Sequence, residues 1–209
     1  MRPVLEPHGE FSHAPAMLTI LAGTNRPGSN TRKVAAVLES LYVELGVTPR
    51  MVDLAGLPAE IFDPASYGEK PASFAPFTEA ILESSGLVVV TPEYNGGPPG
   101  VLKYFIDMLK FPESFERRPV CFVGIAAGQW GALRPVEQLQ AIFGYRNAHL
   151  FPERVFVPRI QDQLDDQGHF KDEELTGRLK RQASGFLQFI ASLTPGKPES
   201  STATPPTRS

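Results

Sequence analysis

Short apolar runs alternate with amphipathic stretches along most of the chain. The run at 87–91, LVVVT, combines β-branched residues with a lack of charge, a pattern typical of a strand covered on both faces of a sheet. Residues 31–46 instead place apolar side chains at helical spacing and end at Gly46, which predicts an amphipathic helix. The same criteria predict strands at 17–22, 50–54, 87–91, 120–126 and 148–158, with Pro152 a candidate break in the last, a loop at 56–71, and helices at 31–46, 74–85, 101–111, 133–146 and 172–193.

This order of elements predicts the fold class. Strands that alternate with helices along a whole chain form a parallel sheet, so we expect an α/β protein. Its size suits a flavodoxin-like, doubly wound, five-stranded parallel sheet with strand order 2-1-3-4-5 and helices on both faces. The Rossmann order is the competing fold, but it usually requires a longer chain and a G-x-G-x-x-G turn, which this sequence lacks.

The two ends of the chain differ from the middle in composition. Residues 1–16 carry acids and prolines where a secretory signal needs an apolar stretch, so we expect a ragged N-terminal leader. Residues 194–209 are rich in Pro, Ser and Thr without large apolar residues, which predicts a disordered C-terminal tail. One flavodoxin-like domain is therefore expected at 17–193.

Composition narrows the function classes. A hydrophobic fraction of 42% and a net charge of −3 indicate a globular protein without the basic surface that binds nucleic acid or an anionic membrane. No apolar run approaches the ~20 residues of a membrane span. The single cysteine, Cys121, rules out an intrachain disulfide and fits a reducing compartment, so we expect a cytoplasmic protein. The four histidines lack the spacing of metal ligands, and we expect no metal site.

The expected topology brings three polar, glycine-containing loops to one edge of the sheet. They are 23–31, 92–100 and 127–131, and they follow the first, third and fourth strands. In this fold the ligand lies beyond the carboxyl ends of the strands, where strands 1 and 3 are neighbours. The three loops together therefore predict a ligand site.

The first loop has glycines at the spacing of a nucleotide triphosphate loop. Gly23 and Gly28 read G-x-x-x-x-G, but Ser29 and Asn30 stand where Lys and then Ser or Thr are required. Hydroxyls, the guanidinium of Arg26 and the start of a helix favour a terminal monophosphate instead. The alternative is that Ser29 or Asn30 only caps the helix.

The second and third loops could receive a flat ring. In PEYNGGPPG, Tyr94 could lie against a ring and Asn95 could hydrogen-bond its heteroatoms, although a rigid turn explains the same residues. In AAGQWGALR, backbone amides near Gly128 and Gln129 could meet the polar rim of the ring. Trp130 would either cover the ring or pack on a neighbouring chain.

Two of these segments resemble a known family. GTNRPGSNTRKVA and, more specifically, PEYNGGPPGVLKYFIDML are similar to the NADPH-dependent FMN reductases, flavodoxin-like oxidoreductases that include quinone, azo-dye and chromate reductases. The resemblance covers about residues 17–160. It implies FMN as cofactor, NADPH or NADH as co-substrate, and a hydride passed to flavin N5 and on to a small acceptor such as a quinone, azo dye or free flavin, in ping-pong order. No catalytic side chain is then needed.

The resemblance also assigns site residues and partners. It implies that the FMN phosphate is held by Thr24, Arg26, Ser29, Asn30 and Thr31, that the isoalloxazine and ribityl chain are wrapped by Pro92, Glu93, Tyr94, Asn95 and Gly96, and that Gly128, Gln129 and Gly131 line the pyrimidine side. It suggests a homodimer or homotetramer with flavin sites near the interface. Arg26, Arg117 and Arg118 are the candidates for the 2′-phosphate of NADPH.

Two other functions remain open. The first is a flavodoxin-type electron carrier that does not itself oxidise NAD(P)H. The net charge of −3 gives little field for docking a reductase, which argues against it. The second is a ligand sensor that keeps the fold without the flavin, and the Trp-containing third loop is its only support.

Overall fold

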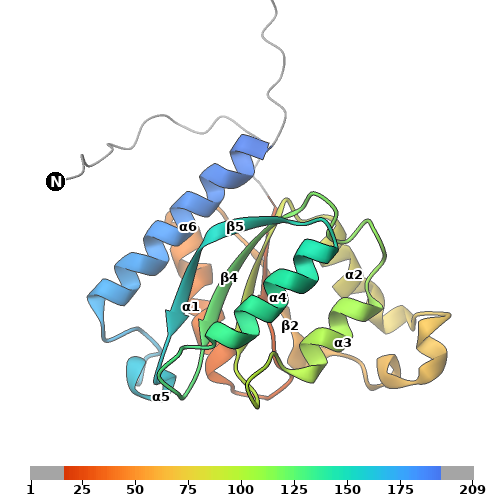
Figure 1. Ribbon diagram of the computed structural model, residues 1–209, viewed down its shortest axis with the longest axis horizontal. Helices are drawn as coiled ribbons and strands as arrows, with labels where there is room; N and C mark the ends of the chain where they lie inside the picture. Colours follow the sequence, from red (N-terminus) through yellow and green to blue (C-terminus); the bar gives the residue numbers. More distant parts are fainter. Residues whose placement is uncertain (1–16, 194–209) are drawn as a thin grey trace, which may run out of the picture.

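The five strands of the sheet are ordered β2-β1-β3-β4-β5, and all of them are parallel (Figure 1). The computed structural model describes residues 17–193, so the predicted leader and tail lie outside the described residues. The strands are β1 Leu18–Ala22, β2 Arg50–Asp53, β3 Gly86–Pro92, β4 Pro119–Ile125 and β5 His149–Val157; the α-helices are α1 Asn30–Glu44, α2 Ala75–Leu82, α3 Gly100–Met108, α4 Leu133–Tyr145, α5 Ile160–Gln163 and α6 Glu173–Leu193.

This topology confirms the predicted flavodoxin-like order. β1 lies between β2 and β3, with Ile20 in register with Met51 on one side and Val88 on the other. β1 and β3 are neighbours, but the chain continues from β1 toward β2 on one side and from β3 toward β4 on the other. The helices that follow these two strands, α1 and α3, therefore cover opposite faces of the sheet. This reversal of direction places the first and second polar loops side by side at the carboxyl edge of the sheet.

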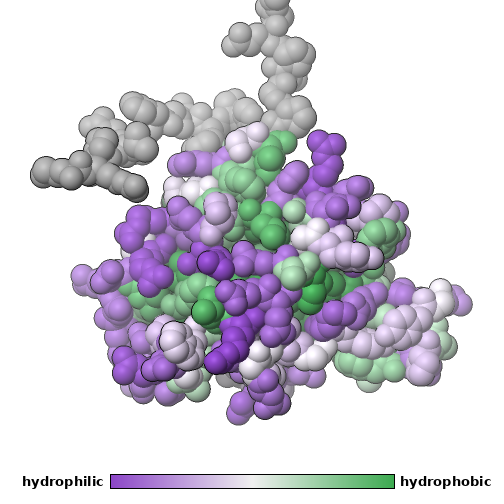
Figure 2. Space-filling model, viewed as in Figure 1, coloured by the Kyte–Doolittle hydropathy of each residue, from purple (hydrophilic) through white to green (hydrophobic). Residues whose placement is uncertain are grey.

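Helices cover both faces of the sheet, and each face has its own core (Figure 1). Val88 and Val90 of β3 face the core shared with α1 and α6, whereas Leu87 and Val89 face the core shared with α2, α3 and α4. All four side chains are at most 1% exposed, which explains why this strand reads as an unbroken apolar run. Figure 2 shows that the outer surface on the α4 side is mostly hydrophilic, with apolar residues in patches between polar ones.

The candidate break at Pro152 is a bulge within a continuous strand. The pairing of β5 with β4 shifts register between Val120 and Phe122, and Pro152, which has no N–H to contribute, lies in the extra stretch of β5. The buried side chain of Gln182 in α6 donates to the carbonyls of Phe122 and Glu153, both at 3.0 Å. These bonds satisfy backbone groups at the irregularity.

The segment predicted as a loop after β2 contains regular turns. Four 3₁₀ turns lie at Leu54–Gly56, Ala59–Phe62, Pro64–Tyr67 and Ala72–Phe74. The hydroxyl of Tyr104 in α3 donates to the Ile61 carbonyl at 2.7 Å, and its ring stacks on Phe62 at a centroid distance of 5.0 Å. Side-chain packing on α3 therefore orders a segment whose prolines and glycines indicated only a loop.

Arginines fix the chain at the opposite, amino edge of the sheet. The Arg118 side chain donates to the carbonyls of Ser84 and Ser114 just before β4 begins. Arg117 precedes it, and its backbone N–H donates to the Asn147 carbonyl at 2.8 Å. Their proposed role at a nucleotide phosphate is therefore wrong, because both lie at the far end of β4 from the three polar loops.

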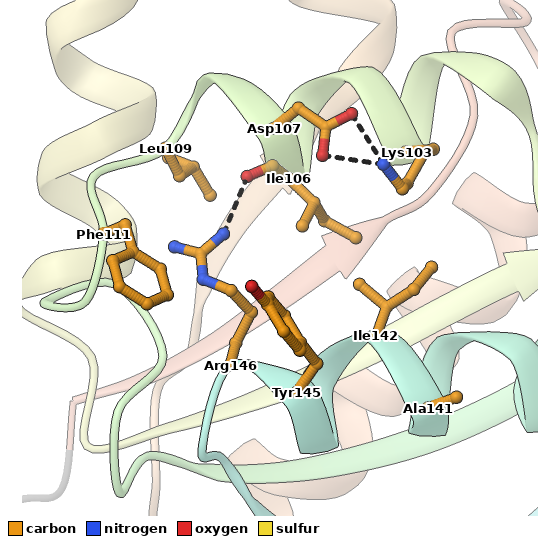
Figure 3. A pocket seen from close by; sticks show the side chains of 9 residues that line it. All are labelled: Lys103, Ile106, Asp107, Leu109, Phe111, Ala141, Ile142, Tyr145 and Arg146. Carbon is orange, nitrogen blue, oxygen red and sulfur yellow. Dashed lines mark hydrogen bonds and ion pairs between the residues drawn. The ribbon is translucent and has the colours of Figure 1, made fainter.

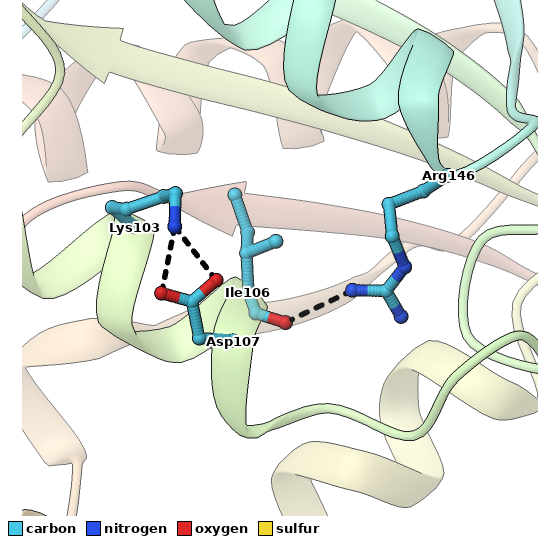
Figure 4. A network of polar contacts seen from close by, with 4 residues as sticks. All are labelled: Lys103, Ile106, Asp107 and Arg146. Carbon is cyan, nitrogen blue, oxygen red and sulfur yellow. Dashed lines mark hydrogen bonds and ion pairs between the residues drawn. The ribbon is translucent and has the colours of Figure 1, made fainter.

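At the same amino edge of the sheet, Arg146 connects the last turns of α3 and α4 (Figure 4). Its guanidinium donates to the carbonyls of Ile106 and Lys110 and lies 4.9 Å from the centroid of the Phe115 ring. Burial lowers its pKa. Beside it, an open groove of about 570 Å³ runs between the two helices, with Phe111 and Tyr145 at its rim (Figure 3).

The thiol of Cys121 gives a test of this packing. Cys121 is fully buried in β4, and desolvation raises its pKa, so both access and thiolate formation are suppressed. We expect the native protein to be unreactive toward Ellman's reagent at pH 8. One thiol per chain should react after unfolding in guanidinium chloride. Rapid reaction of the native protein would contradict the described packing of α1 and α6 over β4.

Candidate functional site

Three loops meet at the carboxyl edge of the sheet, at the lower side of Figure 1. They are 23–29 after β1, 93–99 after β3 and 126–132 after β4. The N–H of Glu93 donates to the Ile125 carbonyl at 3.2 Å, which joins the second loop to the end of β4. The sequence therefore identified correctly the three loops that share this edge.

Gly23 lets the first loop leave β1 in direct contact with β3 and α3. Its N–H donates to the Val90 carbonyl at 2.8 Å. A Cβ at this position would lie 2.8 Å from that carbonyl oxygen and 2.9 Å from a methyl carbon of Leu102. Only glycine fits so close a backbone approach. The first glycine of the G-x-x-x-x-G spacing thus packs the loop against its neighbours.

The start of α1 presents a row of free backbone donors. Gly28 has a left-handed backbone, φ +64°, and Ser29 caps the helix by accepting the N–H of Arg32 at 3.2 Å. The expected cap is therefore present. Among the described residues, no acceptor faces the four N–H groups from Gly28 to Thr31. These groups and the helix dipole favour an anion, so capping and anion binding are compatible here.

The side chains of the first loop divide into exposed and buried groups. Arg26 is exposed, and its guanidinium has no ion-pair partner within the described range; Asn30 is half-buried. Thr24 and Thr31 are each 1% exposed. The Thr24 hydroxyl lies 2.9 Å from the hydroxyl of Tyr94 and accepts the Arg26 N–H at 3.3 Å. Thr24 therefore connects the first loop to the second.

The second loop contains a tight turn. Tyr94 and Gly97 exchange two backbone hydrogen bonds, of 2.9 and 3.1 Å, and the residues between them have positive φ, 52° for Asn95 and 78° for Gly96. This geometry is that of a type I′ turn, for which Asn-Gly is the preferred pair. Neither central N–H has an acceptor in the described part of the chain. Pro92, the last residue of β3, is buried.

Two residues of α4 that the sequence did not single out contact this turn. Arg134 donates to the Glu93 carboxylate at 3.0 Å, and Gln138 donates to the Gly96 carbonyl at 3.2 Å. Both side chains come from one face of the helix that follows the third loop, because they are four residues apart. That spacing was the only sequence signal for them, and it is common in helices.

The third loop is exposed at its tip and tightly packed at its base. Gly128, Gln129 and Trp130 are exposed, and Trp130, at 57%, makes no ring contact with any described residue. Gly131 is buried, and a Cβ there would lie 2.9 Å from the Cβ of Phe156. Gly131 thus packs against β5, whereas Gly128 and Gln129 remain at the surface of the site.

The arrangement combines free amide donors, one exposed guanidinium and exposed aromatic rings at one edge. Within residues 17–193, no three His, Cys, Asp or Glu side chains gather as metal ligands. None of the helices in this range is long and apolar enough to cross a membrane. The donor set suits an anionic group at α1 and a flat, polar-rimmed ring beside the Asn95–Gly96 turn.

Known proteins resemble this chain over most of its length. It is 28% identical to an NAD(P)H-dependent FMN reductase of Pseudomonas aeruginosa over 177 residues, which cover 83% of this chain and 94% of the relative. It is 29% identical to a quinone reductase of Escherichia coli, which covers 81% of this chain and 93% of that protein.

Solved structures share the fold. FerB, a flavoenzyme NAD(P)H:(acceptor) oxidoreductase from Paracoccus denitrificans, superposes with a TM-score of 0.70 at 22% identity, covering 85% of this chain and 98% of that one. A short-chain flavodoxin gives a TM-score of 0.54 at 16% identity, covering 85% of this chain and 99% of that one. The model of one family, described as NADPH-dependent FMN reductase, matches residues 16–162. The chain belongs to the NADPH-dependent FMN reductase family.

Proposed function

We propose that this protein is an FMN-dependent NAD(P)H oxidoreductase that reduces a small acceptor such as a quinone, an azo dye or free flavin. One observation carries the proposal: the free N–H groups from Gly28 to Thr31 and those of Asn95 and Gly96 open on the same edge of the sheet. The first set suits a phosphate and the second a ring with polar heteroatoms. The names of the FMN reductase and quinone reductase relatives agree with this chemistry.

At the phosphate end, the protein supplies hydrogen-bond donors and positive charge for a negatively charged group. The N–H groups at the start of α1 donate to phosphate oxygens, and Arg26 supplies the positive charge from the exposed side of the loop. Ser29 keeps the helix start in place through its cap, and its hydroxyl proton remains available to a ligand. Thr24 and Thr31 are buried, and the Thr24 hydroxyl, 2.9 Å from that of Tyr94, connects the first loop to the second.

At the ring end, the protein supplies orientation and neutral dipoles. When bound here, FMN would supply the redox chemistry, accepting a hydride from NAD(P)H and passing the electrons to the acceptor in a second half-reaction, so we expect ping-pong kinetics. The N–H groups of Asn95 and Gly96, together with the loop at Gly128 and Gln129, stabilise negative charge on the polar rim of the ring. Such donors are fixed before the reaction, so no side chain has to act as acid or base.

The assembly and the location of the protein remain predictions. We propose a homodimer or homotetramer in the cytoplasm, with flavin sites near the interface. Three aromatic residues in or next to α3 differ in exposure: Phe105 is buried in the core, Tyr104 packs on Phe62, and Phe111, which follows the helix, is 63% exposed. A second chain could cover Phe111, but this side chain lies beside Arg146 and Tyr145 at the amino edge of the sheet, away from the candidate site, so it does not support flavin sites near that contact.

The first experiment is reconstitution of the protein with FMN. We expect a yellow protein that oxidises NADPH or NADH with p-benzoquinone as acceptor, without a partner protein, and gives parallel double-reciprocal plots. A protein that binds FMN but does not oxidise either nucleotide would be a flavodoxin-type carrier. A colourless protein that binds no added FMN would contradict the proposal altogether.

Replacing Arg26 tests the phosphate end of the site. Arg26→Ala should weaken FMN binding about tenfold, in line with the loss of one hydrogen bond to a charged group, and should leave riboflavin binding unchanged because riboflavin has no phosphate. Fluorescence titration of the apoprotein measures both affinities. Arg50→Ala is a matched control, since Arg50 pairs with Glu83 at the amino end of β2. Equal loss of riboflavin affinity would place the phosphate elsewhere.

Replacing Trp130 tests whether its side chain contacts a planar acceptor at the exposed face of the flavin ring. If it stacks on a planar acceptor, Trp130→Ala should raise KM for p-benzoquinone about three- to tenfold with little change in FMN affinity, as expected for one aromatic contact. Tyr145→Ala, which removes an aromatic ring 80% exposed at the opposite edge, should leave KM unchanged. A fall in the oligomer mass of Trp130→Ala, measured by light scattering, would instead assign Trp130 to an interface between chains.

A further inference from the structure

The turn that carries the Asn95 and Gly96 donors is fastened to α4 at two points. The Glu93 carboxylate accepts from Arg134 at 3.0 Å before the turn, and the Gly96 carbonyl accepts from Gln138 at 3.2 Å within it. The two α4 side chains lie one helical turn apart, so they contact the second loop at successive positions along its length. We call these two contacts the α4 latch.

The Gln138 contact determines how one peptide plane of the turn is oriented. In the peptide between Gly96 and Gly97, the carbonyl is bound by Gln138 and the N–H donates to the Tyr94 carbonyl at 3.1 Å. Gly97 also packs closely on this side chain, since a Cβ there would lie 3.2 Å from the Gln138 amide oxygen. With both ends of the peptide held, the preceding N–H groups of the turn keep one direction.

The Arg134 contact determines where the one acidic side chain of this loop points. The Glu93 side chain is only 15% exposed, and its carboxylate is turned toward α4 and paired with a guanidinium that is 59% exposed. An unpaired carboxylate at this position would oppose negative charge on a ring bound at the turn. Arg134 neutralises that charge while leaving the neutral N–H donors facing the ligand.

We propose that Arg134 and Gln138 are positioning residues for the flavin ring. Gln138 orients the N–H groups of Asn95 and Gly96 toward the ring. Arg134 holds the Glu93 carboxylate away from the ring and offsets its negative charge. This inference rests on the proposed function, because the ligand is taken to be FMN. The latch itself is a feature of the protein without ligand, so it can be tested before FMN is added.

Amide hydrogen exchange of the apoprotein tests the latch directly. In Gln138→Ala and Arg134→Ala, the N–H groups of Tyr94 and Gly97, which close the turn, should exchange several-fold faster than in the wild type. Gln138→Glu keeps the size of the side chain and removes the donor, so it should behave like Gln138→Ala. Arg134 and Gln138 are exposed, and we expect all variants to keep the wild-type circular dichroism spectrum.

Two measurements with FMN then separate positioning from a merely structural role. Each alanine variant should bind FMN about three- to tenfold more weakly, the effect of one exposed polar contact. Arg134→Ala should also lower the midpoint potential of the bound flavin, since Glu93 is left unpaired, and Arg134→Lys should restore it in part. Gln140→Ala is the matched control, because Gln140 accepts from Arg154 at 3.2 Å and ties the same helix to β5 instead.

The outcomes distinguish this inference from the proposed function. Wild-type exchange rates at 94–97 in both alanine variants, or wild-type FMN affinity and potential in both, would overturn the positioning role. An effect of equal size in Gln140→Ala would also overturn it, since the cause would then be a general loosening of α4. Failure of the wild-type protein to bind FMN would instead reject the proposed function, and the exchange experiment would still report on the latch.

Discussion

The close contact between the ends of β1 and β3 determines where every candidate ligand-binding group lies. The Gly23 N–H bonds the Val90 carbonyl at 2.8 Å, and no side chain fits between them. Because of this contact, the start of α1 and the Asn95–Gly96 turn lie at the same edge of the sheet. If the two strand ends were farther apart, an anion site and a ring site would remain, but no single mononucleotide could occupy both. The hydroxyl contact between Thr24 and Tyr94, at 2.9 Å, holds the same two loops together farther out.

Most of the fold could be predicted from the sequence, because a parallel sheet buried on both faces has a strong signature. Uncharged, β-branched strands alternate with helices of period 3.6, and that alternation leaves few possible topologies. The positions of the three loops followed from the topology alone. The same reasoning shows why Arg117 and Arg118 were misassigned: they immediately precede a strand, so they lie at its amino end, whereas the ligand edge is the carboxyl end. Their charge suggested a phosphate, and their position in the chain excluded it.

The direction of individual side chains could not be predicted in the same way. Thr24, Ser29 and Thr31 look equivalent in the sequence as hydroxyls near a phosphate, yet Thr24 and Thr31 are buried and Ser29 caps a helix. Their orientation depends on how α1 packs on the sheet, which no local pattern records. Arg134 and Gln138 escaped notice for the opposite reason, since polar residues on an exposed helix face are the ordinary case. The Asn95–Gly96 turn was the exception, because its backbone conformation is encoded by the two residues themselves.

The two ends of the site solve different electrostatic problems. A phosphate carries permanent charge, so a permanent cation such as Arg26 and the dipole of α1 are suited to it. A redox-active ring changes its charge during turnover, and a full positive charge beside it would favour one state strongly over the other. Neutral N–H groups respond more weakly and stabilise developing charge without fixing it. The pairing of Glu93 with Arg134 at 3.0 Å is consistent with this requirement, because the two charges offset each other and the Asn95–Gly96 turn then presents neutral dipoles.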